Sequence, residues 1–201
     1  MRVGVMASGR GSNFQAIIDA VNNGEAPDVE IVRLVVNKSD AYAIKRAEEN
    51  NIKFDFIDSS AISREDFDKK AIEIMEKAKV ELIVLAGFMR ILSPLFVKKY
   101  KNKILNIHPS LLPSFPGANA HKDALNYGAK ISGCTVHLVD ENVDSGPIIM
   151  QASVEINENE TEETLAEKIL FHEHKLLPKA LQLMCSNRLI IEGRKVIINT
   201  D

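Results

Sequence analysis

The sequence predicts one α/β domain with a mainly parallel central sheet and helices on both faces. Short apolar runs alternate with segments of helical spacing as far as about residue 110, which is the order that builds a parallel sheet. The run over residues 82–86 is apolar at every position, as a strand covered on both faces should be. After residue 110, two strand-like runs and a long helical segment predict antiparallel additions and a capping helix in the C-terminal third.

The first half of the chain opens with an apolar run over residues 2–6 that fits a buried strand. A glycine-containing loop over residues 7–13 follows. Helical spacing then covers residues 14–21, with Ser12 or Asn13 as the expected N-cap. The same periodicities predict strands over residues 30–36, 53–57 and 82–86, and helices over residues 41–50, 63–79 and 93–100.

The helix predicted over residues 63–79 has a regular amphipathic pattern. Ser63 and Asp66 are spaced as an N-terminal capping pair. Four apolar positions are expected to share the face that packs on the sheet: Phe67, Ala71, Ile74 and Ala78.

The second half begins with a strand from Ile104 that Pro109 should end, because proline lacks the N–H that a strand ladder needs. A loop over residues 111–119 and a short helix over 121–127 follow. Strands are predicted over 131–139 and 148–156, a helix over 161–184 that Pro178 could kink or split, and a hairpin over 190–198 turned at Gly193. No repeat or linker divides the chain, so residues 1–201 are expected to form a single domain.

Composition limits the possible functions. The net charge of −3 gives no basic surplus for nucleic acid or an anionic membrane. No apolar run approaches the roughly 20 residues that span a bilayer, and the N-terminus reaches polar residues too soon for a secretory signal. Two cysteines are too few for a disulfide framework or a thiolate metal site. The expectation is a cytoplasmic protein without nucleic-acid or membrane partners.

Asn106 and His108 are the first candidates for chemistry. Side chains two residues apart on a strand point to the same face. This pair lies where the strand ends, and ligands of open α/β sheets usually bind at the carboxyl ends of strands. The amide donates hydrogen bonds without titrating, and the imidazole changes charge near neutral pH. A structural role in satisfying backbone groups at the strand end is the alternative.

Asp140 and Asp144 strengthen the functional interpretation. They follow a later strand that could lie beside the first, and a carboxylate close to an imidazole favours its charged form. An amide and an imidazolium together could stabilise the oxyanion of a tetrahedral intermediate in acyl transfer. No serine or cysteine stands in a nucleophile elbow, so the attacking group would belong to a substrate.

The first loop is a candidate anion site, because Gly11, Ser12 and Asn13 precede a helix whose free N–H groups and dipole favour phosphate. It is not a dinucleotide fingerprint, since Phe14 stands where the third glycine would be and Asn37 and Lys38 end the second strand in place of an acid. The glycine–lysine ending of a nucleotide-triphosphate loop is also missing. Spacing alone leaves a phosphate cradle and a plain tight turn equally open.

The other histidines are weaker candidates. His121 and His137 are expected to support neighbouring groups. His172 and His174 flank Glu173 on a helix, where residues i and i+2 do not share a face. No segment has the spacing of metal ligands, so no metal site is predicted.

Four segments together resemble the phosphoribosylglycinamide formyltransferases, a family of folate-dependent transferases. They are SGRGSN at 8–13, LAGFMRILSP at 85–94, ILNIHPSLLPSFPG at 104–117 and HLVDENVDSGPII at 137–149. The resemblance runs in order from the first strand to the last helix. It implies a Rossmann-like formyltransferase fold, with a ribonucleotide phosphate-binding half over residues 1–100 and a catalytic and folate-binding half over 101–201.

The resemblance also implies a reaction. The formyl group of 10-formyltetrahydrofolate would pass to the primary amine of glycinamide ribonucleotide in purine (IMP) biosynthesis, without a metal. Asn106, His108 and Asp144 match the catalytic trio of the family. The amine attacks the formyl carbon, Asn106 and protonated His108 hold the oxyanion, and Asp144 raises the proton affinity of the histidine and positions it. His108 or a water would carry a proton to the folate nitrogen.

The binding residues follow by the same resemblance. Gly11, Ser12 and Asn13 would bind the ribonucleotide phosphate, and Glu173 would contact the ribonucleotide. Asn106 also counts among the residues that contact the folate, together with the positions that match the family's folate site: Arg64, Met89, Arg90, Ile91, Leu92, Asp140, Glu141, Asn142, Val143 and Asp144. The partners are these two small molecules, and the protein is expected to be a monomer or a homodimer.

Two positions depart from some relatives. Leu170 replaces a polar residue that could help hold the phosphate, and Asn119 replaces a histidine. Neither belongs to the trio.

Three alternatives share part of this pattern. Formyltetrahydrofolate deformylase carries an extra N-terminal domain, and methionyl-tRNA formyltransferase carries a C-terminal RNA-binding domain, so the length of 201 residues disfavours both. The third is a non-catalytic folate- or nucleotide-binding protein, which would not need an imidazole paired with a carboxylate.

Overall fold

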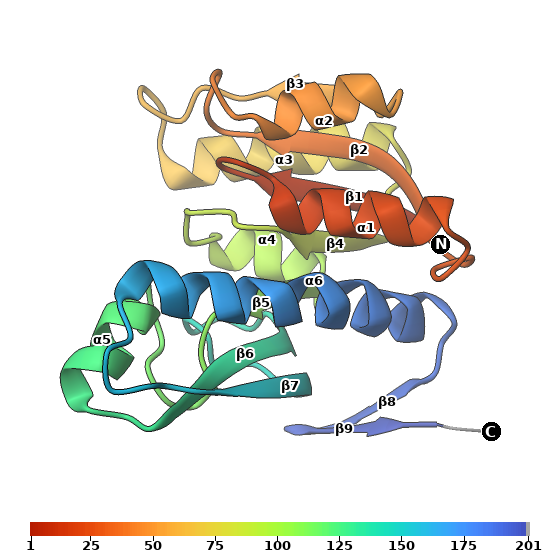
Figure 1. The fold of residues 1–201 in the computed structure, drawn as a ribbon. Helices are drawn as coiled ribbons and strands as arrows, with labels where there is room; N and C mark the ends of the chain where they lie inside the picture. The colour runs from red at the N-terminus through yellow and green to blue at the C-terminus, as the bar shows by residue number, and fades with distance from the viewer. Residues whose placement is uncertain (200–201) are drawn as a thin grey trace.

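The computed structural model describes residues 1–199 and contains a seven-stranded sheet of order β3-β2-β1-β4-β5-β6-β7 (Figure 1). Its strands are β1 (Arg2–Ala7), β2 (Glu30–Val36), β3 (Phe54–Phe56), β4 (Leu82–Leu85), β5 (Ile104–His108), β6 (Ile131–Leu138) and β7 (Ile148–Glu155). The first five strands pair in parallel, and β6 and β7 are antiparallel. This confirms the predicted fold class, a mainly parallel sheet with antiparallel additions in the last third.

The helices also follow the prediction, with ends shifted by a few residues. They are α1 (Ser12–Asn22), α2 (Ala43–Glu49), α3 (Arg64–Lys77), α4 (Pro94–Lys99), α5 (Ala120–Tyr127) and α6 (Glu162–Cys185). The C-terminal hairpin consists of β8 (Leu189–Glu192) and β9 (Lys195–Ile198), and Gly193 supplies its turn with φ of 60°. Within residues 1–199, no helix is long and apolar enough to cross a membrane.

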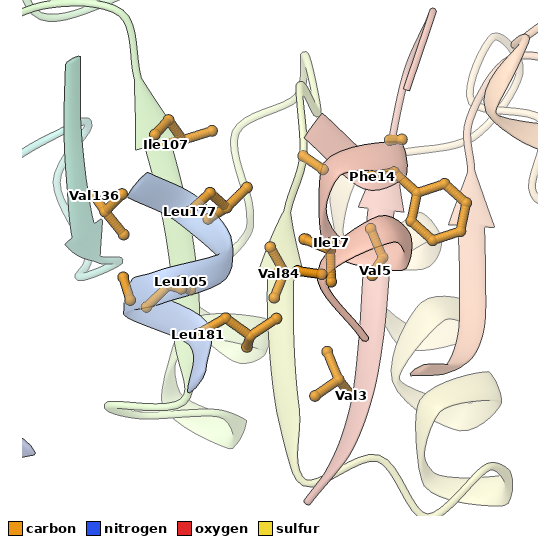
Figure 2. Packing of buried hydrophobic residues seen from close by; sticks show 14 of the residues in the cluster. Val3, Val5, Phe14, Ile17, Val84, Leu105, Ile107, Val136, Leu177 and Leu181 are labelled. Carbon is orange, nitrogen blue, oxygen red and sulfur yellow. The ribbon is translucent and has the colours of Figure 1, made fainter. Parts of the chain in front are cut away.

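The sheet separates two hydrophobic layers. On one face the buried side chains of α1, α2 and α6 pack against the sheet, and on the other face those of α3 and α4 do so. Alternate strand residues serve the two layers: Val84 belongs to the first, and Ile83 and Leu85 belong to the second. Figure 2 shows the first layer, where Leu177 and Leu181 of α6 lie beside β5 and Ile17 of α1 lies near Val5.

Three local details differ from the sequence-based expectation. Gly11, and neither Ser12 nor Asn13, is the N-cap of α1, and no side chain caps this helix. Pro178 lies inside α6 without dividing it. In α3 the buried positions are Phe67, Asp68, Ala71 and Met75, whereas Ile74 and Ala78 are only partly buried. The Ser63 cap is confirmed, since its hydroxyl accepts the Asp66 N–H at 3.1 Å.

The strand order places several loop segments at one edge of the sheet. From β1 the chain adds β2 and β3 on one side and β4 and β5 on the other, so the strand order changes direction between β1 and β4. Such switch points leave a crevice at the carboxyl ends of the strands. The loops after β1 and β4 and the end of β5 all meet there, because these three parallel strands are neighbours.

Candidate active site

Asn106 and His108 lie on β5 as the strand spacing predicts. Asn106 stands beside Leu85 of β4 and opposite His137 of β6, and β5 ends at His108. His108 is 4% exposed, whereas Asn106 is partly exposed. The fold therefore holds the imidazole in a protected position at the carboxyl end of a central strand.

Asp144 contacts both residues, each through a different oxygen. Its Oδ2 lies 3.3 Å from Nδ1 of His108, and its Oδ1 lies 3.5 Å from Nδ2 of Asn106. The backbone N–H of Gly117 donates to Oδ2 at 2.8 Å. The structure thus brings together the three residues that the sequence singled out as a possible trio.

The loop between β6 and β7 folds back to deliver Asp144. Gly146 packs directly on β6, where an added Cβ would lie only 1.8 Å from the carbonyl oxygen of Leu138. Asp140 braces the loop by accepting the Ser145 hydroxyl at 2.7 Å and the Asn142 N–H at 3.0 Å. Asp144 itself has φ of 49°, a left-handed conformation that aspartate adopts more readily than most residues.

Both ring nitrogens of His108 face acceptors. Nδ1 lies near the Asp144 carboxylate, and Nε2 lies 2.9 Å from the carbonyl oxygen of Phe115. A neutral imidazole has only one N–H and would leave one of these acceptors facing a lone pair. An imidazolium has an N–H on each nitrogen and could donate to both acceptors.

His137 supports Asn106 from the neighbouring strand. Its Nδ1 faces the carbonyl of Leu138 at 2.9 Å and must donate to it. Burial is the main cause that lowers the pKa of His137, against the raising effects of the Leu138 hydrogen bond and the Asp144 charge. In the neutral tautomer with its hydrogen on Nδ1, Nε2 accepts an N–H from the Asn106 amide nitrogen 3.1 Å away.

This contact orients the Asn106 amide, with its nitrogen toward His137. One N–H is used by His137, and the other points toward Asp144 across the longer distance of 3.5 Å. The sequence predicts only a general supporting role for His137. Its pairing with Asn106 depends on the β5–β6 register, which sets the two residues opposite each other.

The loop after β1 has a tight shape that requires glycine. Gly11 has φ of 65°, and a Cβ there would lie 2.8 Å from the Cβ of Ala43 on α2. The side chain of Arg46 holds the loop from the same helix, because its Nε donates to the carbonyl of Arg10 at 2.9 Å. The N-cap residue is glycine, so it has no side chain to cap the first N–H groups of α1. Ser12 and Arg46 both line a groove of about 650 Å³ between α1 and α6.

Asn13 and Glu173 form a buried pair behind this loop. Each is 7% exposed, and Nδ2 of Asn13 donates to Oε2 of Glu173 at 2.7 Å. Burial raises the pKa of Glu173, and the Asn13 hydrogen bond offsets this only in part. The Oδ1 atom of Asn13 is buried and has no hydrogen-bond partner within residues 1–199. A buried acceptor of this kind is suited to a donor such as a ligand hydroxyl.

The segment of residues 89–92 forms a lip beside the first loop. The N–H of Met89 donates to the Ser8 hydroxyl at 2.8 Å, which ties the two loops together. Met89 and Ile91 project outward and are 74% and 59% exposed. Leu92, in contrast, is buried in the core, so its side chain does not line the surface. Exposed apolar side chains on an anchored loop are suited to a flat, partly apolar ligand.

The remaining predicted folate residues surround this lip or the Asp144 loop. Arg64 lies exposed at the start of α3, and Arg90 packs its guanidinium over the ring of Phe67, 4.8 Å from its centroid. On the other loop, Glu141, Asn142 and Val143 are exposed, and Asp140 is partly buried.

No group of three or more histidine, cysteine or carboxylate side chains in the described part of the chain could hold a metal ion. His172 and His174 lie on either side of the buried Glu173 and line separate grooves.

The chain is similar to known formyl transferases. The model of the formyl transferase family matches residues 1–181. The chain is 40% identical over 191 residues to phosphoribosylglycinamide formyltransferase of Escherichia coli strain K12, which covers 94% of this chain and 89% of that protein. The crystal structure of glycinamide ribonucleotide transformylase 1 from Symbiobacterium toebii has a TM-score of 0.96 and 43% identity, covering 98% of this chain and 93% of that one.

The chain also matches part of a larger protein. It is 51% identical over 189 residues to the trifunctional purine biosynthetic protein adenosine-3 of Chironomus tentans, covering 92% of this chain and 14% of that protein. It spans only about a fifth or less of the trifunctional relatives that it matches. The family model and the full-length bacterial relative together show that the chain belongs to the formyl transferase family, among its phosphoribosylglycinamide formyltransferases.

Proposed function

We propose that the protein transfers a formyl group from 10-formyltetrahydrofolate to the primary amine of glycinamide ribonucleotide, a reaction of purine biosynthesis. Membership of the formyl transferase family supports the reaction class. The observation that carries the assignment of residues is the contact of Asp144 with both Asn106 and His108 at the carboxyl end of β5. Simple ligand binding would not need this buried pairing of a carboxylate with an imidazole.

In the proposed mechanism the substrate amine is the nucleophile. Its nitrogen bonds to the formyl carbon, the bond from that carbon to the folate nitrogen breaks, and one proton moves from the amine to the departing folate nitrogen. His108 holds the oxyanion through Nε2–H, which turns from the neutral Phe115 carbonyl because a charged oxygen is the stronger acceptor. The second N–H of Asn106, held only loosely by Asp144, supplies the other hydrogen bond.

The two substrates would approach from opposite sides of this pair. The N–H groups at the start of α1 and the Ser12 hydroxyl bind the ribonucleotide phosphate, and Asn13 with Glu173 accepts hydrogen bonds from its hydroxyls. The exposed apolar surfaces of Met89, Ile91 and Val143 contact the folate ring system. The two sets of binding residues therefore place one substrate on each side of Asn106, His108 and Asp144.

The test is an assay of the purified protein with both substrates, in which the folate product is followed by absorbance. Formyl transfer that depends on the ribonucleotide is expected. Folate turnover without ribonucleotide would identify a hydrolase instead, and the lack of any turnover would favour a binding protein.

Replacing Ser12 by aspartate should weaken ribonucleotide binding. A carboxylate at the start of α1 would repel the substrate phosphate at short range, so the KM for the ribonucleotide should rise about tenfold or more while the KM for the folate stays constant. Steady-state kinetics with each substrate varied in turn measures this. Asn22→Asp adds the same charge at the exposed far end of α1 and should leave both KM values unchanged. Equal effects of the two variants would argue against a phosphate cradle at Gly11–Asn13.

Replacing Glu173 by glutamine should stabilise the protein and weaken ribonucleotide binding. Because burial raises its pKa, the folded state holds this proton more tightly than the unfolded chain does. The stability that it contributes is present below the ordinary glutamate pKa and is lost as the pH rises through the raised value. At neutral pH the variant should therefore unfold at a higher temperature, by about 2–4 °C for each kcal/mol gained, and the difference should vanish in acid. Glu167→Gln, exposed on the same helix, is the control, and a lower midpoint for Glu173→Gln would contradict the prediction.

A further inference from the structure

Asp68 is a buried carboxylate that the proposed mechanism does not use. It lies on α3 and is 2% exposed, although the helix periodicity gave no reason to expect an acid on the core side. Burying a carboxylate is costly unless hydrogen bonds or opposite charges compensate for the lost water. The groups that contact Asp68 therefore indicate which part of the structure the buried carboxylate stabilises.

The contacts of Asp68 lead to the lip that carries Met89 and Ile91. Its Oδ2 accepts the N–H of Ser93 at 2.5 Å, and Ser93 is fully buried. Ser93 is also the N-cap of α4, where its hydroxyl accepts the Phe96 N–H at 3.4 Å. Asp68 thus fixes the point at which the lip joins the helix that follows it.

The charge of Arg90, in a second part of the lip, also acts on the Asp68 carboxyl. Burial raises the pKa of this carboxyl, and the hydrogen bonds from Ser93 and the charges of Arg90 and Arg64 oppose the rise. Arg90 is held nearby, because its guanidinium packs over the ring of Phe67 and one of its nitrogens donates to the Ser59 carbonyl at 3.3 Å. Phe67, which precedes Asp68 on α3, and the Ser59 carbonyl therefore hold the Arg90 side chain in place.

The other end of the lip is anchored independently. Met89 donates its N–H to the Ser8 hydroxyl, and Ser8 donates its own N–H to the Gly87 carbonyl at 3.1 Å. Between this anchor and the Asp68 anchor, Met89 and Ile91 project into solvent. A mobile loop loses conformational entropy when a ligand orders it. A loop that is already held in its binding conformation avoids most of this entropic cost of binding.

We propose that Asp68 is a positioning residue for the folate site, which holds the 89–92 lip in its binding conformation through Ser93 and Arg90. The inference rests on the proposed function for the identity of the ligand, a folate, that the lip binds. Asp68 acts through its neighbours and touches neither substrate. Its removal should therefore change the binding of one substrate and leave the chemical step intact.

Asp68→Asn is the sharpest variant, because an amide oxygen still accepts the Ser93 N–H while the charge that attracts Arg90 is lost. The KM for 10-formyltetrahydrofolate should rise about fivefold, since charged hydrogen-bond acceptors are roughly twice as strong as neutral ones. The kcat and the KM for the ribonucleotide should change by less than about twofold. Glu73→Gln removes the same charge from the exposed side of α3 and should have no effect on any of these constants.

A double-variant cycle separates this role from a general effect on stability. If Asp68 acts through Arg90, then Asp68→Asn should raise the folate KM much less in an Arg90→Met background than in the wild type. Additive effects in the cycle, or equal rises in both KM values, would overturn the proposal.

A measurement that does not depend on turnover distinguishes the proposed function from the positioning role of Asp68. Calorimetric titration with tetrahydrofolate under anaerobic conditions should show weaker binding to Asp68→Asn than to the wild type. Wild-type protein that binds tetrahydrofolate but transfers no formyl group would contradict the proposed function and leave the positioning role standing. Wild-type transfer with unchanged folate binding in Asp68→Asn would refute only the positioning role. Were Asp68→Asn unable to fold, Arg90→Met alone should still weaken tetrahydrofolate binding, and unaltered binding in that variant would count against the proposal.

Discussion

His108→Ala is expected to lower kcat about a thousandfold or more, because it removes both an oxyanion donor and a candidate proton carrier. The loss should fall on kcat, since the ring contacts Asp144 and the Phe115 carbonyl in the free protein and is not among the residues proposed to anchor either substrate. Tetrahydrofolate should still bind with nearly normal affinity. Single-turnover kinetics together with calorimetric titration measures the two quantities separately.

His172→Ala is a matched control for this variant, because it removes an imidazole from the surface of α6 on the far side of Glu173. It should retain the wild-type rate. If His108→Ala kept a rate within about tenfold of the wild type, the oxyanion role would be wrong, since loss of a single oxyanion donor already costs about a hundredfold to a thousandfold. A loss of folate binding in parallel with kcat would instead indicate that the loop around Phe115 had collapsed into the site.

The sequence predicted the parts of the site that depend on local rules. Asn106 and His108 lie on one face because they are two residues apart on a strand, and Pro109 ends that strand. The order of strands and helices predicted a mainly parallel sheet, which places the loops after β1 and β4 next to the end of β5. These inferences required only periodicity and the chemistry of proline.

The parts that sequence reasoning missed depend on register and on close packing. The contact between His137 and Asn106 exists because β6 pairs with β5 so that these two residues face each other, and the number of residues in the connecting loop does not determine that register. The Phe115 carbonyl reaches His108 through a backbone bend at φ of 52°, which the sequence PSFPG does not specify. Asp68 was missed because one acid on a helix is most often solvated, and only the fold shows that it lies under the 89–92 lip.

Asp144→Asn should be nearly as damaging as the loss of His108, with kcat lower by about a hundredfold to a thousandfold. The amide is almost the same size, so it can keep one contact with the Gly117 N–H. However, it removes the only negative charge that the structure places within 4 Å of the buried His108 ring, among residues 1–199. Without this counter-ion, the proposed positive charge on the imidazole next to the oxyanion is less well stabilised and the ring is less well oriented. Asp123→Asn, exposed on α5, is the charge-matched control.

The double variant His108→Ala/Asp144→Asn decides whether these residues act as one unit. If Asp144 works by keeping His108 charged and oriented, it has nothing left to do once the ring is absent, so the double variant should be no slower than His108→Ala alone. Losses that multiplied across the two sites would show that Asp144 has a separate effect, through its 3.5 Å contact with Asn106 or through the folate loop that carries it. The cycle therefore measures how much of the carboxylate's contribution passes through the imidazole, which is the central claim of the proposed mechanism.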